Sequence, residues 1–208
     1  MRSGMMMRAR ATCFAATALT LMAAAGVAGA QAAPASAVPI KPAAQSYGGP
    51  NVGDMAPDFA LPGATRYGEL KAPVRLSDFR GQTVVLAFFP GARTPGCTIQ
   101  MTKYRDMYQS LFKGGDSVVV LGVSVDPDTT LADWAREAHF PMVFASDAGT
   151  HAAGTAYGAY DTTYKLNKRL LYVIGPDGRI TYVAKPFTVS KMESYTALGD
   201  AVAKAAGR

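Results

Sequence analysis

The chain contains two cysteines, Cys13 and Cys97, and the surroundings of the second one suit thiol chemistry. Cys97 belongs to the stretch FFPGARTPGCTIQ, residues 88–100, where Pro90, Thr94 and Cys97 have the spacing Pro-x3-Thr-x2-Cys. Threonine is a good helix N-cap and proline suits the first helical position, so the spacing predicts a helix with Cys97 in its first turn. Free backbone N–H groups and the positive helix end favour a thiolate there, by about 0.3 to 2 kcal/mol.

The thiolate is the reactive form of cysteine, so this setting favours a redox-active or nucleophilic residue. A nearby guanidinium would stabilise the ionised sulfur further. Gly96 leaves room beside the sulfur, where a small substrate would approach, and Pro90 ends the preceding strand and shields the sulfur from bulky reactants. The alternative is an inert thiol, because a lone cysteine in an apolar setting often serves as a small core residue.

Residues 1–30 have the composition of a secretory signal peptide. The first ten positions carry three arginines and no acid, an alanine-rich apolar run follows over residues 11–30, and Ala28-Gly29-Ala30 offers a small-x-small cleavage site. A membrane anchor and an organelle transit peptide are the alternatives. Cys13 lies near the start of the apolar run instead of at its end, which does not suit lipid attachment. We expect an exported, periplasmic protein with one remaining thiol, which cannot form an internal disulfide.

The rest of the chain has the composition of one globular domain with a short linker before it. Residues 31–53 are rich in Ala, Pro, Gly and Ser, which predicts a flexible linker, and the domain is expected over residues 54–208. Without the leader, 18 basic side chains face 15 acidic ones, a net charge of about +3 that argues against nucleic acid and membrane binding. His139 and His151 stand alone, so no metal or cofactor is expected.

The pattern of apolar residues then predicts the elements that position Cys97. Residues 83–89 and 117–125 are apolar and valine-rich, as in strands covered on both faces. Residues 101–112 between them have helical periodicity with Gly114-Gly115 as a stop, which predicts a right-handed βαβ unit.

The elements expected after this unit form a regular series. They are a helix over 130–139, a strand over 142–146, a weak helix, a hairpin of residues 170–174 and 180–183 around GPDG, and a last helix with a capping box from Ser190 to Glu193. Residues 54–82 are expected to add a turn and a hairpin. This order predicts an α/β, thioredoxin-like fold, with a mixed central sheet and helices on both faces.

The stretch LAFFPGARTPGCTIQMTKYRD resembles the active-site segment of peroxiredoxins, especially the bacterioferritin comigratory protein subgroup. GDMAPDFALP, VRLSDFRGQTVVLAFFP, VVVLGVSVD and KRLLYVIGPDGRITYV resemble further segments of that family in the same order, over about residues 51–185. The resemblance implies a thiol-dependent peroxidase in which Cys97 attacks a hydroperoxide and becomes a sulfenic acid. It implies that Thr94 holds the peroxide and the sulfur, that Pro90 shields them, and that Arg169 stabilises the thiolate and the peroxide oxygens.

Two positions depart from the pattern of that subgroup. Many members carry a second cysteine five residues after the first, where this chain has Thr102, so the resemblance implies a one-cysteine cycle closed by an external thiol or by a disulfide between two chains. Gln100 stands where glutamate is common, which leaves the arginine without a carboxylate partner. Lys165 and Lys168 are weaker alternatives to Arg169 as the cation.

The implied partners are a hydroperoxide, either hydrogen peroxide or an organic one, and a reductant that is a thioredoxin-like protein or a small thiol. The protein is expected to be a monomer or a homodimer. The alternative functions are an envelope thioredoxin-like thiol-disulfide protein, which Thr94 opposes by standing where a C-x-x-C pair would begin, and a non-catalytic binding or holdase domain. A Cys/His hydrolase built with His139 or His151 is a weaker alternative.

Overall fold

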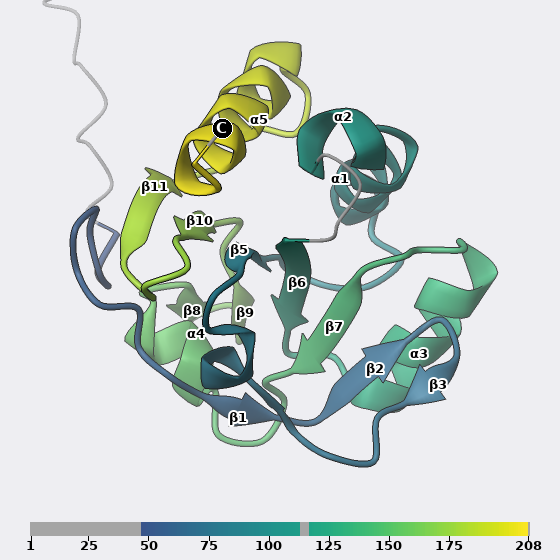
Figure 1. Cartoon of the computed structure of the whole chain (residues 1–208). Coiled ribbons are helices and arrows are strands. Elements are labelled where there is room, and N and C mark those ends of the chain that lie inside the picture. The colour runs from purple at the N-terminus through teal and green to yellow at the C-terminus, as the bar shows by residue number, and fades with distance from the viewer. Residues whose placement is uncertain (1–46, 113–116, 208) are drawn as a thin grey trace, which may run out of the picture. The chain divides into compact units, whose positions relative to one another are not determined.

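The computed structural model describes residues 47–112 and 117–207. In this part of the chain the main sheet has seven strands in the order β11-β10-β5-β6-β7-β2-β3 (Figure 1). The pairs β5–β6 and β6–β7 are parallel and the others antiparallel, so the predicted mixed sheet is confirmed. The strands are β2 (Gly63–Thr65), β3 (Gly68–Glu69), β5 (Thr83–Phe88), β6 (Val118–Ser124), β7 (Val143–Ser146), β10 (Leu171–Ile174) and β11 (Ile180–Ala184).

Short elements and helices complete the described part. Two small antiparallel pairs join β1 to β4 and β8 to β9. These strands are β1 (Ala60–Leu61), β4 (Val74–Arg75), β8 (Tyr160–Asp161) and β9 (Leu166–Asn167). The helices are a 3-10 turn (Leu76–Phe79), α1 (Pro95–Asp106), α2 (Tyr108–Phe112), α3 (Asp128–Glu137), α4 (Ala152–Ala156) and α5 (Met192–Ala205).

The centre of the sheet is covered on both faces, as its apolar strands predict. Every residue of β5 is buried, and successive side chains point to opposite faces. Val85 and Ala87 belong to one hydrophobic cluster, whereas Leu86 and Phe88 belong to another. The first cluster also contains buried residues of α1, α3 and α5, and the second contains Ala153 of α4. Helices therefore cover both faces of the sheet, and the thioredoxin-like architecture is confirmed (Figure 1).

The helix that follows β5 is broken, where the sequence predicted one continuous helix. α1 ends at Asp106, and Met107 has the backbone angles φ −102° and ψ 16°, outside the helical range. α2 then begins at Tyr108 and brings Leu111 and Phe112 into the core. Buried residues of both helices, among them Met101 and Phe112, belong to the same hydrophobic cluster on one face of the sheet. The predicted stop at Gly114-Gly115 lies outside the described residues.

The predicted capping box of the last helix is wrong. α5 begins at Met192 with Lys191 as its N-cap, and no side chain caps the helix. A turn in which the Lys191 N–H donates to the Thr188 carbonyl precedes the helix. This turn delays the first helical residue, so Ser190 lies outside the position from which its hydroxyl would cap the N–H groups.

Residues 47–53, assigned from composition to the flexible linker, make hydrogen bonds to the domain. Lys185 Nζ donates to the carbonyl oxygens of Gly48, at 3.2 Å, and Pro50, at 2.9 Å. The ordered contacts therefore begin ahead of Asp54. The predicted leader, residues 1–30, and the rest of the predicted linker lie outside the described residues. Within residues 47–112 and 117–207, no helix combines the length and apolar character needed to cross a bilayer.

The outer edge of β11 is also met by this N-terminal segment. The Gly53 N–H donates to the Ile180 carbonyl, and the Ile180 N–H donates to the Asp54 carbonyl, at 2.8 and 2.9 Å. A further bond of 3.0 Å joins the Ala56 N–H to the Gly178 carbonyl. The start of this edge strand therefore has backbone partners on both sides.

Candidate active site

The candidate active site lies at the carboxyl end of β5, where the chain leaves the sheet and enters α1. Thr94 is the N-cap of α1, with φ −73° and ψ 147°, and Pro95 is the first helical residue, so the predicted helix start is confirmed. Cys97 accordingly lies in the first turn. Pro90 is half-buried between β5 and this turn. The carboxyl ends of parallel strands are where α/β proteins place their sites.

The structure brings Arg169 beside Cys97. The sulfur is fully buried, and Arg169 Nη2 donates a hydrogen bond to Cys97 Sγ at 3.2 Å. Arg169 lies just before β10, which pairs antiparallel with β5. The start of β10 therefore lies beside the end of β5, and the guanidinium is close to the start of α1. A hydrogen bond from a charged donor stabilises a thiolate by about 1.5 to 3 kcal/mol. Lys168, an alternative cation, instead faces Asp161 at 3.7 Å.

Gln100 holds the other side of the same guanidinium. The residue is fully buried one helical turn after Cys97, and its Oε1 accepts a short hydrogen bond from Arg169 Nη1. Its Nε2 donates to the phenol oxygen of Tyr104 at 2.9 Å. The amide therefore stands where the subgroup commonly has a carboxylate, and it supplies a neutral acceptor for the arginine.

The space beside Gly96 serves the arginine rather than the substrate. An ideal Cβ on Gly96 would lie 3.1 Å from Arg169 Nη2. This approach is closer than side-chain carbons normally make, so any larger residue would displace the guanidinium. Gly96 therefore permits the contact between Arg169 and Cys97.

The hydroxyl of Thr94 makes a local bond. It donates to the carbonyl oxygen of Gly91 at 2.9 Å, and no side-chain bond caps the helix N–H groups. Thr94 is exposed at the entrance to the turn. Its contact stabilises the loop between Pro90 and α1, and the oxygen retains lone pairs that can accept a hydrogen bond from a hydroperoxide.

Asp126 fixes the loop from the neighbouring strand. It follows β6, and its Oδ2 accepts hydrogen bonds from the Ala92 N–H and the Ser124 hydroxyl, both at 2.8 Å. Ser146 donates to the Asp126 carbonyl at 2.7 Å. Three adjacent segments at the carboxyl edge of the sheet therefore share one residue, which ties the loop before α1 to β6 and β7.

The two histidines make no hydrogen bond to the thiol site. His139 is exposed after α3. His151 is half-buried, and its ring stacks on Tyr160 with centroids 4.2 Å apart. Neither histidine forms a hydrogen bond with Cys97, so the structure does not support a Cys/His hydrolase. In the described ranges no group of three or more His, Cys, Asp or Glu residues is arranged to hold a metal.

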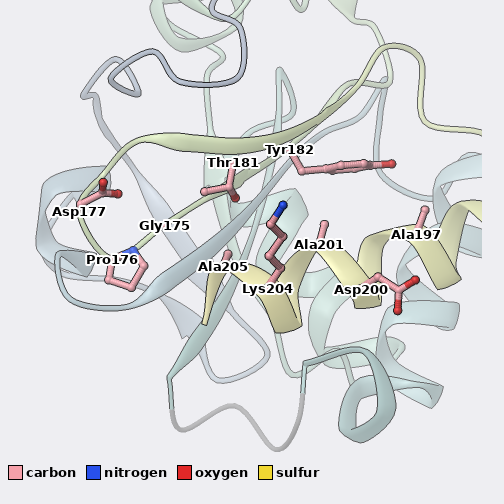
Figure 2. A pocket seen from close by; sticks show the side chains of 10 residues that line it. All are labelled: Gly175, Pro176, Asp177, Thr181, Tyr182, Ala197, Asp200, Ala201, Lys204 and Ala205. Carbon is pink, nitrogen blue, oxygen red and sulfur yellow. The ribbon is translucent and has the colours of Figure 1, made fainter. Parts of the chain in front are cut away.

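A groove away from this site lies between β11 and α5 (Figure 2). Tyr182 lines it from the strand, and Asp200 and Lys204 line it from the helix. Its lining includes neither Cys97 and Arg169 nor the residues that bond to them, so the groove is separate from the thiol site.

Tyr104 and Asp126 are site residues that sequence reasoning missed. Tyr104 falls within the helical pattern of residues 101–112, and its spacing of four from Gln100 places the two side chains on one helical face. Asp126 follows the last residues of a predicted parallel strand, a location where polar side chains often serve a site. Both signals were present, but neither identifies the hydrogen-bond partner.

Fold and site together define a cysteine-dependent oxidoreductase of thioredoxin-like architecture. Residues 52–183 match the model of the AhpC/TSA family. Peroxiredoxin Bcp of Escherichia coli strain K12 is 36% identical over 144 residues, which cover 66% of this chain and 87% of the relative. The putative chloroplastic peroxiredoxin Q of Oryza sativa subsp. indica is 30% identical over 158 residues, covering 74% of this chain and 72% of the relative.

A solved structure gives the same result. The crystal structure of peroxidoxin BcpB from Mycobacterium tuberculosis superposes with a TM-score of 0.62 at 28% identity, covering 74% of this chain and 96% of that one. The chain belongs to the AhpC/TSA family, and its relatives place it among the Bcp-like peroxiredoxins. It is a thiol-dependent peroxidase.

Proposed function

We propose that the protein reduces hydrogen peroxide or organic hydroperoxides in a one-cysteine cycle that an external thiol completes. One observation carries the proposal: Arg169 Nη2 lies 3.2 Å from Cys97 Sγ, which stands in the first turn of α1. A cation and a helix N-terminus converge on one sulfur. Both stabilise negative charge, first on the thiolate and then on the oxygens of the reacting peroxide.

The first half of the cycle is a displacement at oxygen. The Cys97 thiolate attacks the terminal oxygen of ROOH, an S–O bond forms and the O–O bond breaks. The sulfur is oxidised to a sulfenic acid, and the alkoxide or hydroxide that leaves takes up a proton to give alcohol or water. Arg169 is placed to stabilise the charge that develops on the leaving oxygen.

The second half needs a thiol from outside the domain, because Cys97 is the only cysteine after Cys13. An external thiol attacks the sulfenic sulfur, releases water and forms a mixed disulfide. A second thiol then restores Cys97. This cycle distinguishes the protein from a C-x-x-C reductase, which stores two electrons in its own pair of thiols.

Burial of Cys97 bears on the reduction step. The residue has no exposed surface, so a reductant thiol cannot reach Sγ while the first turn of α1 is closed. The reductant, a small thiol or a thioredoxin-like protein, therefore acts on a form in which this turn has opened.

The test uses the full chain carrying Cys13→Ser, so that Cys97 is the sole thiol. After one equivalent of hydrogen peroxide, mass spectrometry follows thiol loss and a sulfenic-acid adduct, with Cys97→Ser as the blank. We expect adduct formation at Cys97 much faster than oxidation of free cysteine. Oxidation no faster than that of a free thiol would support the non-catalytic binding or holdase alternative instead.

We also propose that the protein is exported to the periplasm after removal of residues 1–30. The support is the arginine-rich start, the apolar run and the Ala28-Gly29-Ala30 pattern. Cell fractionation together with mass measurement of the N-terminus tests this directly. An intact Met1 in the cytosolic fraction would contradict export, and an intact apolar run in the membrane fraction would indicate an anchor.

A further inference from the structure

The orientation of the Gln100 amide matters to the site because its two ends have opposite hydrogen-bonding character. The oxygen accepts and the NH2 group donates, although the two ends have almost the same shape. Arg169 offers only donors, so the end of Gln100 that faces it must be the oxygen. The NH2 group then points into the core, where the phenol oxygen of Tyr104 accepts from it at 2.9 Å.

We propose that Tyr104 is a positioning residue for the reaction at Cys97, acting through Gln100 and Arg169. The inference rests on the proposed peroxidase function and adds a residue to its machinery. Gln100 has no exposed surface, so an NH2 group without an acceptor would be left unsatisfied in the core. The amide would then turn or shift, and Arg169 would lose the acceptor that holds its Nη1.

The guanidinium is held by two hydrogen bonds, and both determine how it is oriented toward the sulfur. Nη1 donates to Gln100 Oε1 while Nη2 donates to Cys97 Sγ at 3.2 Å. A planar guanidinium held by both nitrogens has one orientation, whereas one held by the sulfur alone can rotate or move away. Tyr104 therefore influences the sulfur from a distance by keeping the first of these two bonds in place.

The ring of Tyr104 is itself well held, so its oxygen has a defined position. It packs edge to face against Phe112, with centroids 5.7 Å apart, and against Tyr195, at 6.2 Å. Phe187 lies at 6.2 Å on a further side. Burial raises the pKa of Tyr104, although the hydrogen bond from Gln100 lowers it in part, so the phenol stays neutral.

The role depends on the amide of residue 100. A methionine there would have nearly the same length but neither an oxygen for Arg169 nor an NH2 group for Tyr104. The phenol could then exert no effect on the guanidinium through this side chain. Removal of the Tyr104 hydroxyl should therefore slow the reaction when residue 100 is Gln and matter little in the Gln100→Met variant.

The experiment is a double-mutant cycle in the full chain with Cys13→Ser: the parent, Tyr104→Phe, Gln100→Met and the two together. The second-order rate constant for oxidation of Cys97 by hydrogen peroxide is measured in each, at a temperature where circular dichroism shows all four folded. We expect Tyr104→Phe to lower the rate roughly fivefold to thirtyfold in the Gln100 background and less than about twofold in the Gln100→Met background. Tyr108→Phe, which also loses a hydroxyl beside Phe112, is the matched control and should leave the rate unchanged.

An equal loss of rate in both backgrounds would show that Tyr104 acts through packing, and it would overturn the inference. So would a Tyr104→Phe rate equal to that of a fast parent, and in that case the peroxidase function would stand. A parent that reacts no faster than free cysteine overturns the peroxidase function and this inference with it.

Discussion

Arg169 and Cys97 are 72 positions apart in the sequence, and their side chains meet at 3.2 Å. The antiparallel register of β10 against β5 brings them together, since Leu171, the first residue of β10, pairs with Ala87, one residue before the end of β5. Arg169 is thereby placed at the same edge of the sheet as the loop that enters α1. The catalytic pair is a product of strand pairing.

Replacement of Arg169 tests how much of the rate depends on this pair. Arg169→Ala removes both bonds to the site, and we expect the rate of Cys97 oxidation to fall about a hundredfold. Arg169→Lys keeps a charge but not the planar fork, so it should recover only part of the rate, roughly tenfold below the parent. Stopped-flow measurement of thiol oxidation gives both values. Arg75→Ala, at an exposed residue of β4, is the control, and a similar loss there would contradict a specific role.

Gly96→Ala separates activity from stability. The new Cβ would lie 3.1 Å from Arg169 Nη2, so the guanidinium must retreat by a few tenths of an ångström, and we expect the rate to fall about threefold to tenfold. Alanine favours helix over glycine by about 0.5 to 1 kcal/mol, so the protein should not lose stability. Peroxide kinetics and thermal unfolding together check the prediction.

Gly199→Ala in α5 is the matched control for this change. Its Cβ would meet Leu111 Cδ2 at 3.5 Å, an ordinary contact, so the substitution should stabilise the helix and leave the rate as it was. An unchanged rate in Gly96→Ala would mean that the guanidinium tolerates the displacement.

Asp126→Ala should loosen the loop before α1. The change leaves the Ala92 N–H and the Ser124 hydroxyl without their acceptor, and we expect the free energy of unfolding to fall by about 1 to 2 kcal/mol. The rate of Cys97 oxidation should fall as well, because the loop sets the start of the helix. Urea denaturation and peroxide kinetics measure the two effects. Asp133→Ala, which breaks an exposed ion pair with Arg136, should change neither by much.

Thr102→Cys reports on opening of the first turn of α1. Residues 97 and 102 are five apart on a helix, which separates their Cα atoms by roughly 9 Å, beyond the distance that a disulfide can bridge. We therefore expect peroxide to produce the Cys97 sulfenic acid first and the disulfide only in a slower step, with loss of one water. Time-resolved mass spectrometry distinguishes these species. A disulfide that forms as fast as the sulfenic acid would mean that the turn is already open.

Asp147 predicts a pH dependence of stability. The carboxyl group is buried after β7; burial raises its pKa, and the hydrogen bond from the Gly154 N–H, at 2.7 Å, lowers it only in part. A raised pKa in the folded state means that the folded protein holds the proton more tightly than the unfolded chain does. The stability contribution is thus present below the ordinary value of 3.8 and is lost as the pH rises through the folded-state value.

Asp147→Asn should remove this part of the pH dependence. An amide oxygen can still accept from Gly154, and the side chain no longer ionises. Urea denaturation at a series of pH values above 3.8 should show the parent losing stability relative to the variant as the pH increases. Asp200→Asn at an exposed residue is the control for removal of a charge, and parallel curves for parent and Asp147→Asn would contradict the prediction.

Local signals in the sequence were sufficient for much of the fold. The apolar composition of β5 and β6, the helix start at Thr94 and the GPDG hairpin each depend on neighbouring residues, and each was predicted. The predicted capping box at Ser190 is wrong because a turn before the helix, which the residue pattern does not reveal, determines where α5 begins. At Met107 the backbone leaves the helical range although the apolar spacing continues, so helical periodicity does not reveal the break.

Less of the candidate site than of the fold could be predicted from the sequence. Cys97 was identified from its local setting, whereas the place of Arg169 came from resemblance, because no local pattern encodes pairing between β5 and β10. The contacts of Gln100 with Arg169 and Tyr104 depend on side-chain orientation in the core, and sequence spacing gives only the shared helical face. Gly96 was predicted to make room, but the structure shows that the arginine uses it.

The segment from Gly53 to Ala56 has a consequence for how the molecule behaves among its neighbours. An exposed edge strand has unpaired backbone N–H and C=O groups. A second polypeptide can pair with these groups, and such pairing leads to aggregation. Here the backbone groups of Ile180 that face outward are already occupied by the protein's own chain. A second polypeptide could therefore pair with the start of β11 only by displacing the segment from Gly53 to Ala56.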